Sequence, residues 1–226
     1  MPGIREHAGM SFDIAPMNPP AWTPGAVHLW WLGGDMRPAP QTRRTRIDQL
    51  LRRVLAPYVG LAPDALRFGR EAHGRPFLLA EHAPDFNLSD TRGGCLVAVA
   101  AQGRIGIDLE RLDRQLSHRE LARRYFATAE IAVLEALPDE PARQAFLRLW
   151  TAKESSCKAT GTGIFGWLPR WSFDPATDAP SLRTLPDEAG DAALWHHRRI
   201  QPHPDFTAVL SCKGFVPAIR GFLLNE

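Results

Sequence analysis

Residues 95–110 read CLVAVAAQGRIGIDLE, and this stretch decides the fold. Its first seven residues are small and apolar, Gln102 and Gly103 form a turn signal, and the second part alternates apolar residues with polar or small ones. This pattern predicts two strands joined as a hairpin. In the second strand, alternation places Asp108 and Glu110 together on one face, opposite the apolar residues that enter a core.

These two carboxylates are candidates for a metal site. Neighbouring carboxylates repel each other unless a positive charge lies between them, and their oxygens suit Mg²⁺, which takes one or two carboxylates and completes its shell with phosphate and water. An isolated Asp-x-Glu is also typical of a solvated strand end. From this motif alone, both interpretations stay open.

Downstream of the hairpin, the sequence predicts a long helix from about residue 141 to residue 160. Its apolar residues recur on one stripe, and Gly161 and Gly163 supply the stop signal. Glu154 and Lys158 are four residues apart and therefore lie on one helix face. They are either a surface ion pair or part of a site.

Just upstream of the hairpin, residues 86–91 read FNLSDT, a cluster of short polar side chains. An Asx or serine turn is one interpretation of this cluster. Ser89 is not expected to be a catalytic nucleophile, because no Gly-x-Ser-x-Gly elbow surrounds it.

The remaining segments indicate a repeated architecture. A strand is predicted over residues 26–32, followed by an arginine-faced amphipathic helix over residues 43–56 that stops at Pro57. The arginine face is either a solvated surface or an anion-binding one. Since residues 206–214 repeat the earlier strand and turn, we expect two similar α/β halves, residues 26–115 and 116–226, after a loose arm of residues 1–25.

Composition excludes several classes of protein. The chain has 226 residues, 44% of them hydrophobic and 23% charged, as in an ordinary globular protein. No apolar run approaches the roughly 20 residues of a membrane helix, so we expect a soluble protein. A net charge of +2 is too small for a dedicated nucleic-acid binder. Three widely spaced cysteines indicate neither disulfides nor a zinc site and favour the cytoplasm.

Taken in order, five segments resemble one protein family. They are GRP at residues 74–76, FNLS at 86–89, GIDLE at 106–110, RYFATAE at 124–130 and WTAKESSCKATG at 150–161. The set resembles the 4'-phosphopantetheinyl transferases of the long, monomeric, surfactin-synthetase-activating type. The resemblance spans about residues 26–215.

This resemblance implies a fold and an activity. The implied fold is an α/β pseudo-dimer of two similar halves, each a small, mainly antiparallel sheet packed with helices. The implied enzyme transfers the phosphopantetheine arm of coenzyme A to a serine of an apo acyl or peptidyl carrier protein and releases adenosine 3',5'-bisphosphate. Mg²⁺ is the implied metal, with Mn²⁺ as a possible substitute, and the carrier protein is the implied partner of a monomer.

The resemblance also assigns roles to individual residues. Asp108, Glu110 and Glu154 match the Mg²⁺ ligands, and the base that activates the carrier serine is Glu154, Glu110 or a bound water. Lys158 matches the lysine that neutralises the splitting pyrophosphate. The positions that match coenzyme A contacts are Arg43, Arg75, Ser89 and Asp90.

Asp90 departs from the family's pattern, which has a phosphate-contacting histidine at this position. A carboxylate there repels phosphate. Three outcomes are open: Asp90 turns away or binds the metal through water while a nearby arginine takes the lost contact, or the affinity for coenzyme A drops. In the last case the chain is a catalytically impaired coenzyme A or nucleotide-binding relative.

Overall fold

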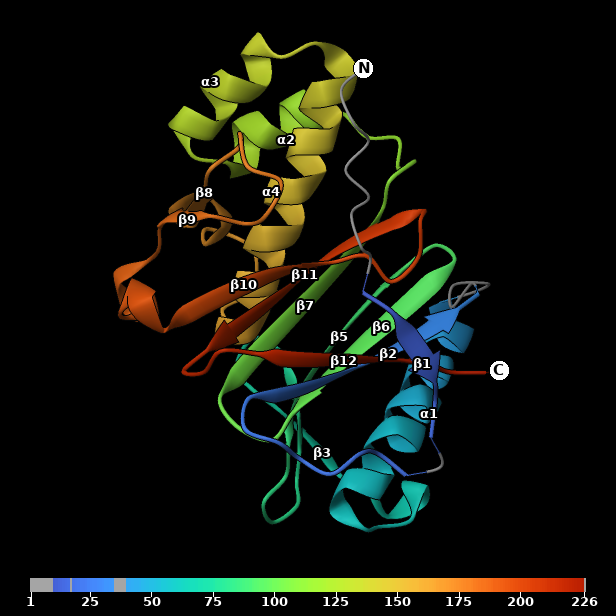
Figure 1. The fold of residues 1–226 in the computed structure, drawn as a ribbon. Coiled ribbons are helices and arrows are strands. Elements are labelled where there is room, and N and C mark those ends of the chain that lie inside the picture. The colour runs from blue at the N-terminus through green and yellow to red at the C-terminus, as the bar shows by residue number, and fades with distance from the viewer. Residues whose placement is uncertain (1–9, 17, 35–39, 226) are drawn as a thin grey trace.

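The computed structural model describes residues 10–16, 18–34 and 40–225. Two main sheets run through these residues (Figure 1). The first has the strand order β1 (Phe12–Ile14), β12 (Ala218–Leu223), β2 (Ala26–Gly33), β6 (Gly94–Ala100) and β5 (Asp85–Thr91). The second has the order β10 (Trp195–Ile200), β11 (Phe206–Lys213) and β7 (Arg104–Arg111).

Helices and two small ribbons complete the chain. The helices are α1 (Pro40–Val59), α2 (His118–Tyr125), α3 (Thr128–Ala136) and α4 (Asp139–Thr160), and the ribbons are β3 (Phe68–Arg70) with β4 (Pro76–Leu78), and β8 (Ser172–Phe173) with β9 (Leu182–Thr184). Short 3₁₀ turns span Pro63–Ala65, Leu168–Arg170, Asp187–Ala189 and Ala192–Leu194. None of the described helices is long and apolar enough to cross a bilayer.

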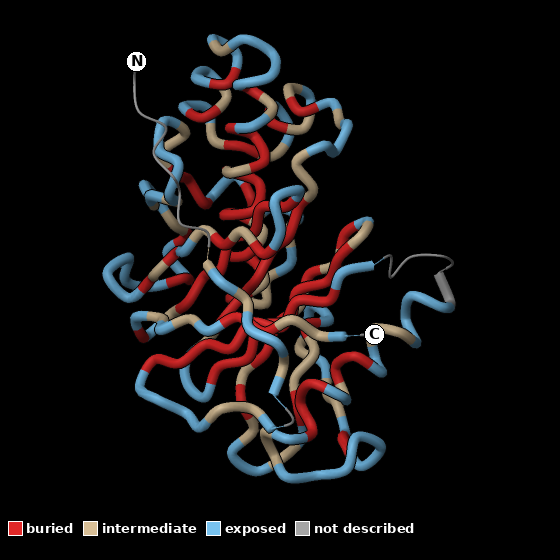
Figure 2. Tube along the Cα trace, turned by 45° about the vertical axis from the view of Figure 1, so that its right-hand side comes forward, coloured by how far each residue is buried: buried red, intermediate tan, exposed pale blue. Residues whose placement is uncertain are grey.

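The two main sheets pack face to face, and each carries one long helix on its outer face. Alternate residues of β2 and β6 point inward to meet the inward residues of β7 and β11, which together form the central core. The other residues of β2 and β6 pack under α1. Helix α4 lies against β7 and β11 on the far side. Figure 2 shows the buried residues concentrated in these strands and along α4.

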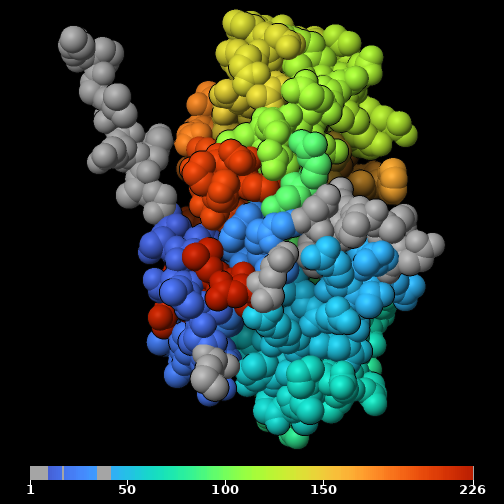
Figure 3. All heavy atoms as spheres, turned by 90° about the vertical axis from the view of Figure 1, so that its right-hand side faces the viewer, coloured from blue at the N-terminus to red at the C-terminus, as the bar shows by residue number. Residues whose placement is uncertain are grey.

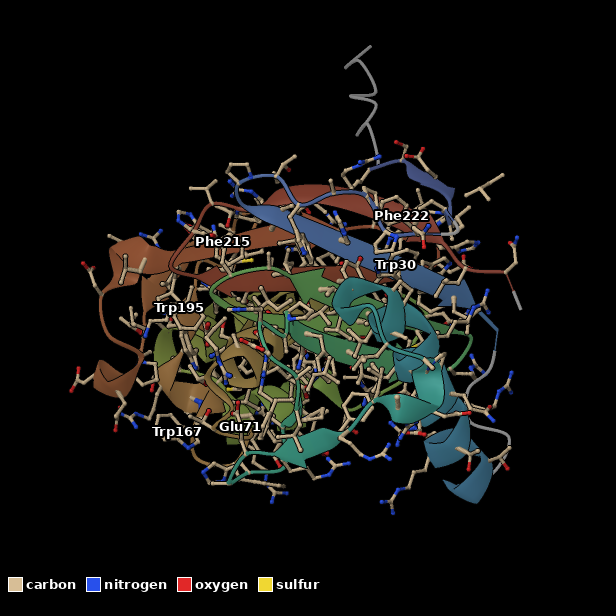
Figure 4. The ribbon with its side chains drawn as sticks, turned by 90° about the horizontal axis from the view of Figure 1, so that it is seen from below. Trp30, Glu71, Trp167, Trp195, Phe215 and Phe222 are labelled. Carbon is tan, nitrogen blue, oxygen red and sulfur yellow. The ribbon has the colours of Figure 1, made fainter. Side chains whose placement is uncertain are left out.

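The outer cores are built around aromatic side chains. Figure 4 shows Trp30 and Phe222 on the α1 side, where their ring centroids are 4.8 Å apart. Trp167 and Trp195 lie in the other outer core, beside α4. Each long helix therefore has its own apolar cluster in addition to the core that the sheets share.

The predicted pairing of two similar α/β halves is confirmed. In the first half, β2 is followed by α1, β5 and β6, and the strands lie in the order β2-β6-β5. In the second unit, which starts at β7 and therefore inside the range of residues 26–115 predicted for the first half, β7 is followed by α4, β10 and β11, and the strands lie in the order β7-β11-β10. The two strands whose sequences repeat are β6 and β11. Strand β6 lies between β2 and β5, and β11 lies between β7 and β10. Most strand pairs are antiparallel, whereas β12 pairs in parallel with β1 and β2.

The predicted hairpin of residues 95–110 is wrong in its pairing, although both of its strands form. Strand β6 pairs with β2 and β5, and β7 pairs with β11, so the chain passes from one sheet to the other at residues 101–103. The hairpin partner of β6 is β5, across a turn in which Gly93 has φ +86°. The sequence signals a turn at Gly103 correctly but not which strands pair.

The ends of two predicted segments also differ from the structure. Helix α1 continues past Pro57 to Val59 and ends at Gly60, which has the left-handed φ of +66°. In the predicted arm of residues 1–25, residues 12–14 form β1, which pairs with β12, and residues 1–9 and 17 lie outside the described residues. The division into halves at residue 115 stays a prediction.

Side chains of β5 join the two sheets where their edges meet. Asp85 Oδ2, Asn87 Oδ1 and Ser89 Oγ accept hydrogen bonds from the backbone N–H groups of Ile105, Ile107 and Leu109 at 2.8, 2.9 and 3.2 Å. We refer to these three side chains and three N–H groups as the side-chain seam. The polar cluster of residues 86–91 therefore lies in strand β5 and not in an Asx or serine turn. Its alternate side chains accept hydrogen bonds from the backbone of β7.

Helix α4 approaches β7 closely at Gly106. A Cβ atom added to this glycine would lie 2.0 Å from the carbonyl oxygen of Ser155 and 2.5 Å from the backbone nitrogen of Ala159. Only glycine allows the helix backbone this close to the strand. As a result, α4 side chains one turn apart reach the polar face of β7.

We expect Asn87→Ala to lower the free energy of unfolding by about 1–3 kcal/mol, because the N–H of Ile107 becomes a buried donor without an acceptor. Urea unfolding at neutral pH measures the change. Asn18→Ala, at an exposed position, is the control and should leave the free energy of unfolding unchanged. Equal stability of the two variants would contradict a structural role for the seam.

Candidate active site

A cavity of about 1360 Å³ opens where α1, β5, β7 and α4 meet. Figure 3 faces the side on which α1 (blue to cyan) lies below the region of α2 to α4 (green to yellow). Both halves of the chain line the cavity. Among the lining residues are Arg43, Arg44, Arg70, Ser89, Asp90, Arg92, Asp108, Glu110, Arg111, Arg114, Glu154 and Lys158.

Asp108, Lys158 and Ser89 form the centre of this site. Lys158 Nζ donates hydrogen bonds to Asp108 Oδ1 at 2.7 Å and to Ser89 Oγ at 3.0 Å, and Ser89 Oγ donates to Asp108 Oδ1 at 3.0 Å. Burial lowers the pKa of Lys158, but the charges of Asp108 and Glu154 outweigh this effect and raise it. Lys158 is therefore a fixed, permanently charged ammonium group.

Glu154 and Glu110 flank this centre. The pKa of Glu154 is raised to about 8, first because the carboxyl is buried and then because the charge of Asp108 lies close to it. Lys158 opposes this shift and Glu110 adds to it. Glu110, on β7, forms an ion pair with Arg114. Three carboxyl groups thus share a small volume with two cationic side chains.

Asp90 forms a two-pronged ion pair with Arg43. Arg43 Nε donates to Asp90 Oδ2 at 2.9 Å and Arg43 Nη2 donates to Asp90 Oδ1 at 2.5 Å. The hydrogen bond to Asp90 raises the pKa of Arg43. The side chain of Asp90 is only 4% exposed, so it does not turn out toward solvent. An arginine that pairs with the Asp90 carboxylate is none of the outcomes that the sequence left open, and those outcomes stay predictions.

Arg75 does not line the cavity. Its buried guanidinium donates to Asp85 Oδ2 at 2.8 Å and to the carbonyl oxygens of Lys158, Ile105 and Phe86 at 2.9, 2.9 and 3.2 Å. It connects the end of α4 with both strands of the side-chain seam. The structure therefore brings together Arg43, Ser89, Asp90, Asp108, Glu110, Glu154 and Lys158, and places Arg75 behind them.

Several arginines that sequence reasoning did not single out also line the cavity. Arg44 lies beside Arg43 on α1, Arg70 ends β3, and Arg92 lies in the turn after β5. No motif marks them, because arginine supplies nearly all of the positive charge throughout this chain. The sequence gives one indication of a binding role, and only for Arg44, which shares a helix face with other arginines. Such a lining favours anions with several charges, such as phosphates.

The carboxyl groups suit a divalent cation by their chemistry. Asp108 Oδ2 is buried without a hydrogen-bond partner among the described residues, and an oxygen in that state is available as a ligand. The mutual repulsion that raises the pKa of Glu154 falls when a cation lies between the carboxylates. In the part of the chain that the structure describes, however, no three His, Cys, Asp or Glu side chains are already grouped closely enough to hold a metal ion. Lys158 and Arg114 instead pair with Asp108 and Glu110.

Comparison with known proteins gives consistent matches. A family model described as the 4'-phosphopantetheinyl transferase superfamily matches residues 104–210. The 4'-phosphopantetheinyl transferase HetI of Nostoc sp. is 34% identical over 181 residues, which cover 79% of this chain and 73% of HetI. A 4'-phosphopantetheinyl transferase of Bacillus subtilis is 31% identical over 140 residues, which cover 62% of this chain and 61% of that protein.

One solved structure is more distantly similar. The holo-[acyl-carrier-protein] synthase of Thermotoga maritima is 23% identical, with a TM-score of 0.40, and the match covers 50% of this chain and 64% of that one.

We expect Glu154→Gln to stabilise the protein in the presence of EDTA, and to do so more at pH 9 than at pH 5. Between its ordinary pKa of 4.5 and the raised value of about 8, the folded chain holds a proton that the unfolded chain has released. The free energy of unfolding therefore falls as the pH rises through this range, by about 4 kcal/mol between pH 5 and pH 9, and the amide variant lacks this loss. Urea unfolding at both pH values measures it, with the exposed Glu81→Gln as control. A pH-independent difference would contradict the raised pKa.

We expect Asp90→Asn to tighten the binding of inorganic pyrophosphate by about tenfold, because it frees the guanidinium of Arg43 to bind an anion. Isothermal titration calorimetry measures the affinity. Asp48→Asn removes the same charge from an exposed cavity residue that pairs with Arg52, and it should change the affinity less than twofold. If both variants tighten binding equally, net charge rather than the Arg43 pair controls anion binding.

Proposed function

Because this chain belongs to the 4'-phosphopantetheinyl transferase family, we propose that it transfers the phosphopantetheine arm of coenzyme A to a serine of an apo acyl or peptidyl carrier protein. Adenosine 3',5'-bisphosphate is the other product. The observation that carries the proposal is the group of Asp108, Glu154 and Lys158 within an arginine-lined cavity.

Coenzyme A fits the chemistry of the cavity. It carries a pyrophosphate and a third phosphate, and the lining offers Arg44, Arg70 and Arg92 as cations in addition to Arg43. Guanidinium groups bind phosphate oxygens through two parallel hydrogen bonds. Arg75 contributes indirectly, because it holds the strands and the end of α4 in place behind the lining.

The reaction is a displacement at phosphorus. The oxygen of the carrier serine forms a bond with the phosphorus that bears the pantetheine arm, and the bond from that phosphorus to the bridging oxygen of the pyrophosphate breaks. We assign the serine proton to the Glu154 carboxylate, which lines the cavity close to Asp108 and Lys158. Glu110 or a bound water is the alternative base. Lys158 stabilises the negative charge that develops on the leaving oxygen.

Asp108, Glu110 and Glu154 are the residues that would hold Mg²⁺, or Mn²⁺ in its place. The ion would neutralise the pyrophosphate oxygens and make the phosphorus easier to attack. The partnerless Asp108 Oδ2 and the mutual repulsion of the carboxylates support this assignment.

The proposal includes the cellular location, the oligomeric state and the macromolecular partner of the enzyme. We place it in the cytoplasm as a monomer whose macromolecular partner is the carrier protein, with no role for nucleic acid or membranes. The three cysteines are free and buried, in keeping with a reducing compartment.

A catalytically impaired coenzyme A or nucleotide-binding relative is the second candidate function. The observation in its favour is the Arg43–Asp90 pair, which takes one guanidinium away from phosphate binding. This relative would bind coenzyme A without transferring its arm.

Intact-protein mass spectrometry tests the proposal. We expect an apo carrier protein incubated with this protein, coenzyme A and Mg²⁺ to gain the mass of one phosphopantetheine arm, and EDTA to prevent the gain. Asp108→Ala should lower the transfer rate by at least about 100-fold, because it removes a metal ligand and the partner of Lys158. Asp64→Ala, at an exposed position, is the control. Binding of coenzyme A without any transfer to several carrier types would favour the impaired relative.

A further inference from the structure

We propose that Arg114 competes with the metal for Glu110, so that a divalent cation has to displace the guanidinium group before it binds there. This inference rests on the proposed function, because Glu110 is one of the residues assigned to Mg²⁺. It adds a residue that no motif marks, and it makes loading of the site an exchange of one cation for another.

Both carboxylates that β7 presents to the cavity are paired with a cation of the chain. Asp108 Oδ1 lies 2.7 Å from Lys158 Nζ, and Glu110 forms its ion pair with Arg114. The side chains of Asp108 and Glu110 are only 4% and 8% exposed, so solvent ions screen these pairs weakly. A divalent cation that binds either carboxylate therefore competes with a positive charge that is already in place.

Of the two cations, Arg114 is the one that is held more weakly. Lys158 Nζ donates hydrogen bonds to two side chains and one backbone carbonyl oxygen. The guanidinium of Arg114 bonds to Glu110 alone among the described residues, and its side chain is 43% exposed, against 26% for Lys158. We therefore expect the exchange to occur at Glu110, while the ammonium group of Lys158 stays in the site.

The loop that carries Arg114 allows this change of partner. Residues 112–117 connect the end of β7 with the start of α2, and residues 113–115 are exposed. The base of the loop is fixed at Leu112, whose N–H donates to the backbone just before β11 at 2.9 Å and whose carbonyl oxygen accepts from an arginine of α4. Rotation of an exposed arginine side chain therefore leaves β7 in place.

Displacement from Glu110 has a consequence for the binding of anions. Arg114 lines the same cavity as Arg44, Arg70 and Arg92. Once its guanidinium has left Glu110, the N–H donors can bind a phosphate oxygen in the cavity. Metal and phosphate ligand then raise each other's affinity through Arg114, in addition to the attraction between their own charges.

Binding of Mn²⁺ to the protein without coenzyme A tests the exchange, and electron paramagnetic resonance of the unbound ion measures the Kd. For Arg114→Gln we expect this Kd to fall by about three- to tenfold, because the competing charge at Glu110 is gone. Arg111→Gln is the matched control. Arg111 also lines the cavity, but it pairs with Asp113, so its substitution should change the Kd less than twofold.

Two further variants assign the effect to the charge of Arg114 and to its partner. Arg114→Lys keeps a cation within reach of Glu110, so we expect its Kd for Mn²⁺ to stay within about twofold of the unsubstituted protein. In a Glu110→Gln background, Arg114→Gln should also change the Kd less than twofold. Thermal unfolding in EDTA checks that every variant is folded. Equal tightening in Arg114→Lys and Arg114→Gln would overturn the proposal, because it would show that the charge does not compete.

The remaining outcomes separate this inference from the proposed function. An unchanged Kd in Arg114→Gln overturns the inference and leaves the metal site in place. If neither the unsubstituted protein nor Arg114→Gln binds Mn²⁺, the inference and the metal assignment both fail. If Arg114→Gln binds Mn²⁺ more tightly but the unsubstituted protein modifies no carrier, the proposed function fails and the competition at Glu110 stands.

Discussion

The side-chain seam is the constraint on which the rest of the structure depends. Strand β7 has one edge paired with β11, and the N–H groups on its other edge face β5, where no backbone ladder forms. Buried N–H groups without acceptors are costly, so the oxygens of Asp85, Asn87 and Ser89 replace the missing carbonyls. Side-chain hydrogen bonds therefore connect β5 to β7 although the two strands belong to separate sheets.

The site concentrates unfavourable charge at a place where packing permits little relaxation. Three carboxyl groups lie together, and Gly106 brings the backbone of α4 close to β7, so a movement of the helix that separated them would disturb this packing. The apolar clusters on both sides of the second sheet resist such a movement. The free energy that the folded chain gains from these clusters thus offsets the repulsion within the site. A poised active site commonly reduces stability in this way.

The sequence predicted local features of this protein well and long-range ones poorly. Alternation placed Asp108 and Glu110 on one strand face, and the helical spacing placed Glu154 beside Lys158, because both patterns depend only on nearby residues. The pairing of β6 with β5 instead of β7 was missed, since the acceptors that satisfy β7 come from side chains about 20 residues away. For the same reason Asp90 was interpreted alone, because its partner Arg43 is 47 residues distant. Arg75 lies in a matching motif, yet nothing local indicates that it points behind the cavity.

The position of β12 has a consequence for the order in which the chain folds. Among the described strands β12 is the last to be made, yet it lies between β1 and β2 in the first sheet. A ribosome that has released only the first half therefore exposes β2 with one open edge, whose free N–H and C=O groups invite pairing with other chains. Parallel pairing of strands so distant in sequence also carries a large loop-closure entropy. We conclude that β2 lacks its second neighbouring strand until residues 218–223 have been made, so the first sheet is completed only late in synthesis.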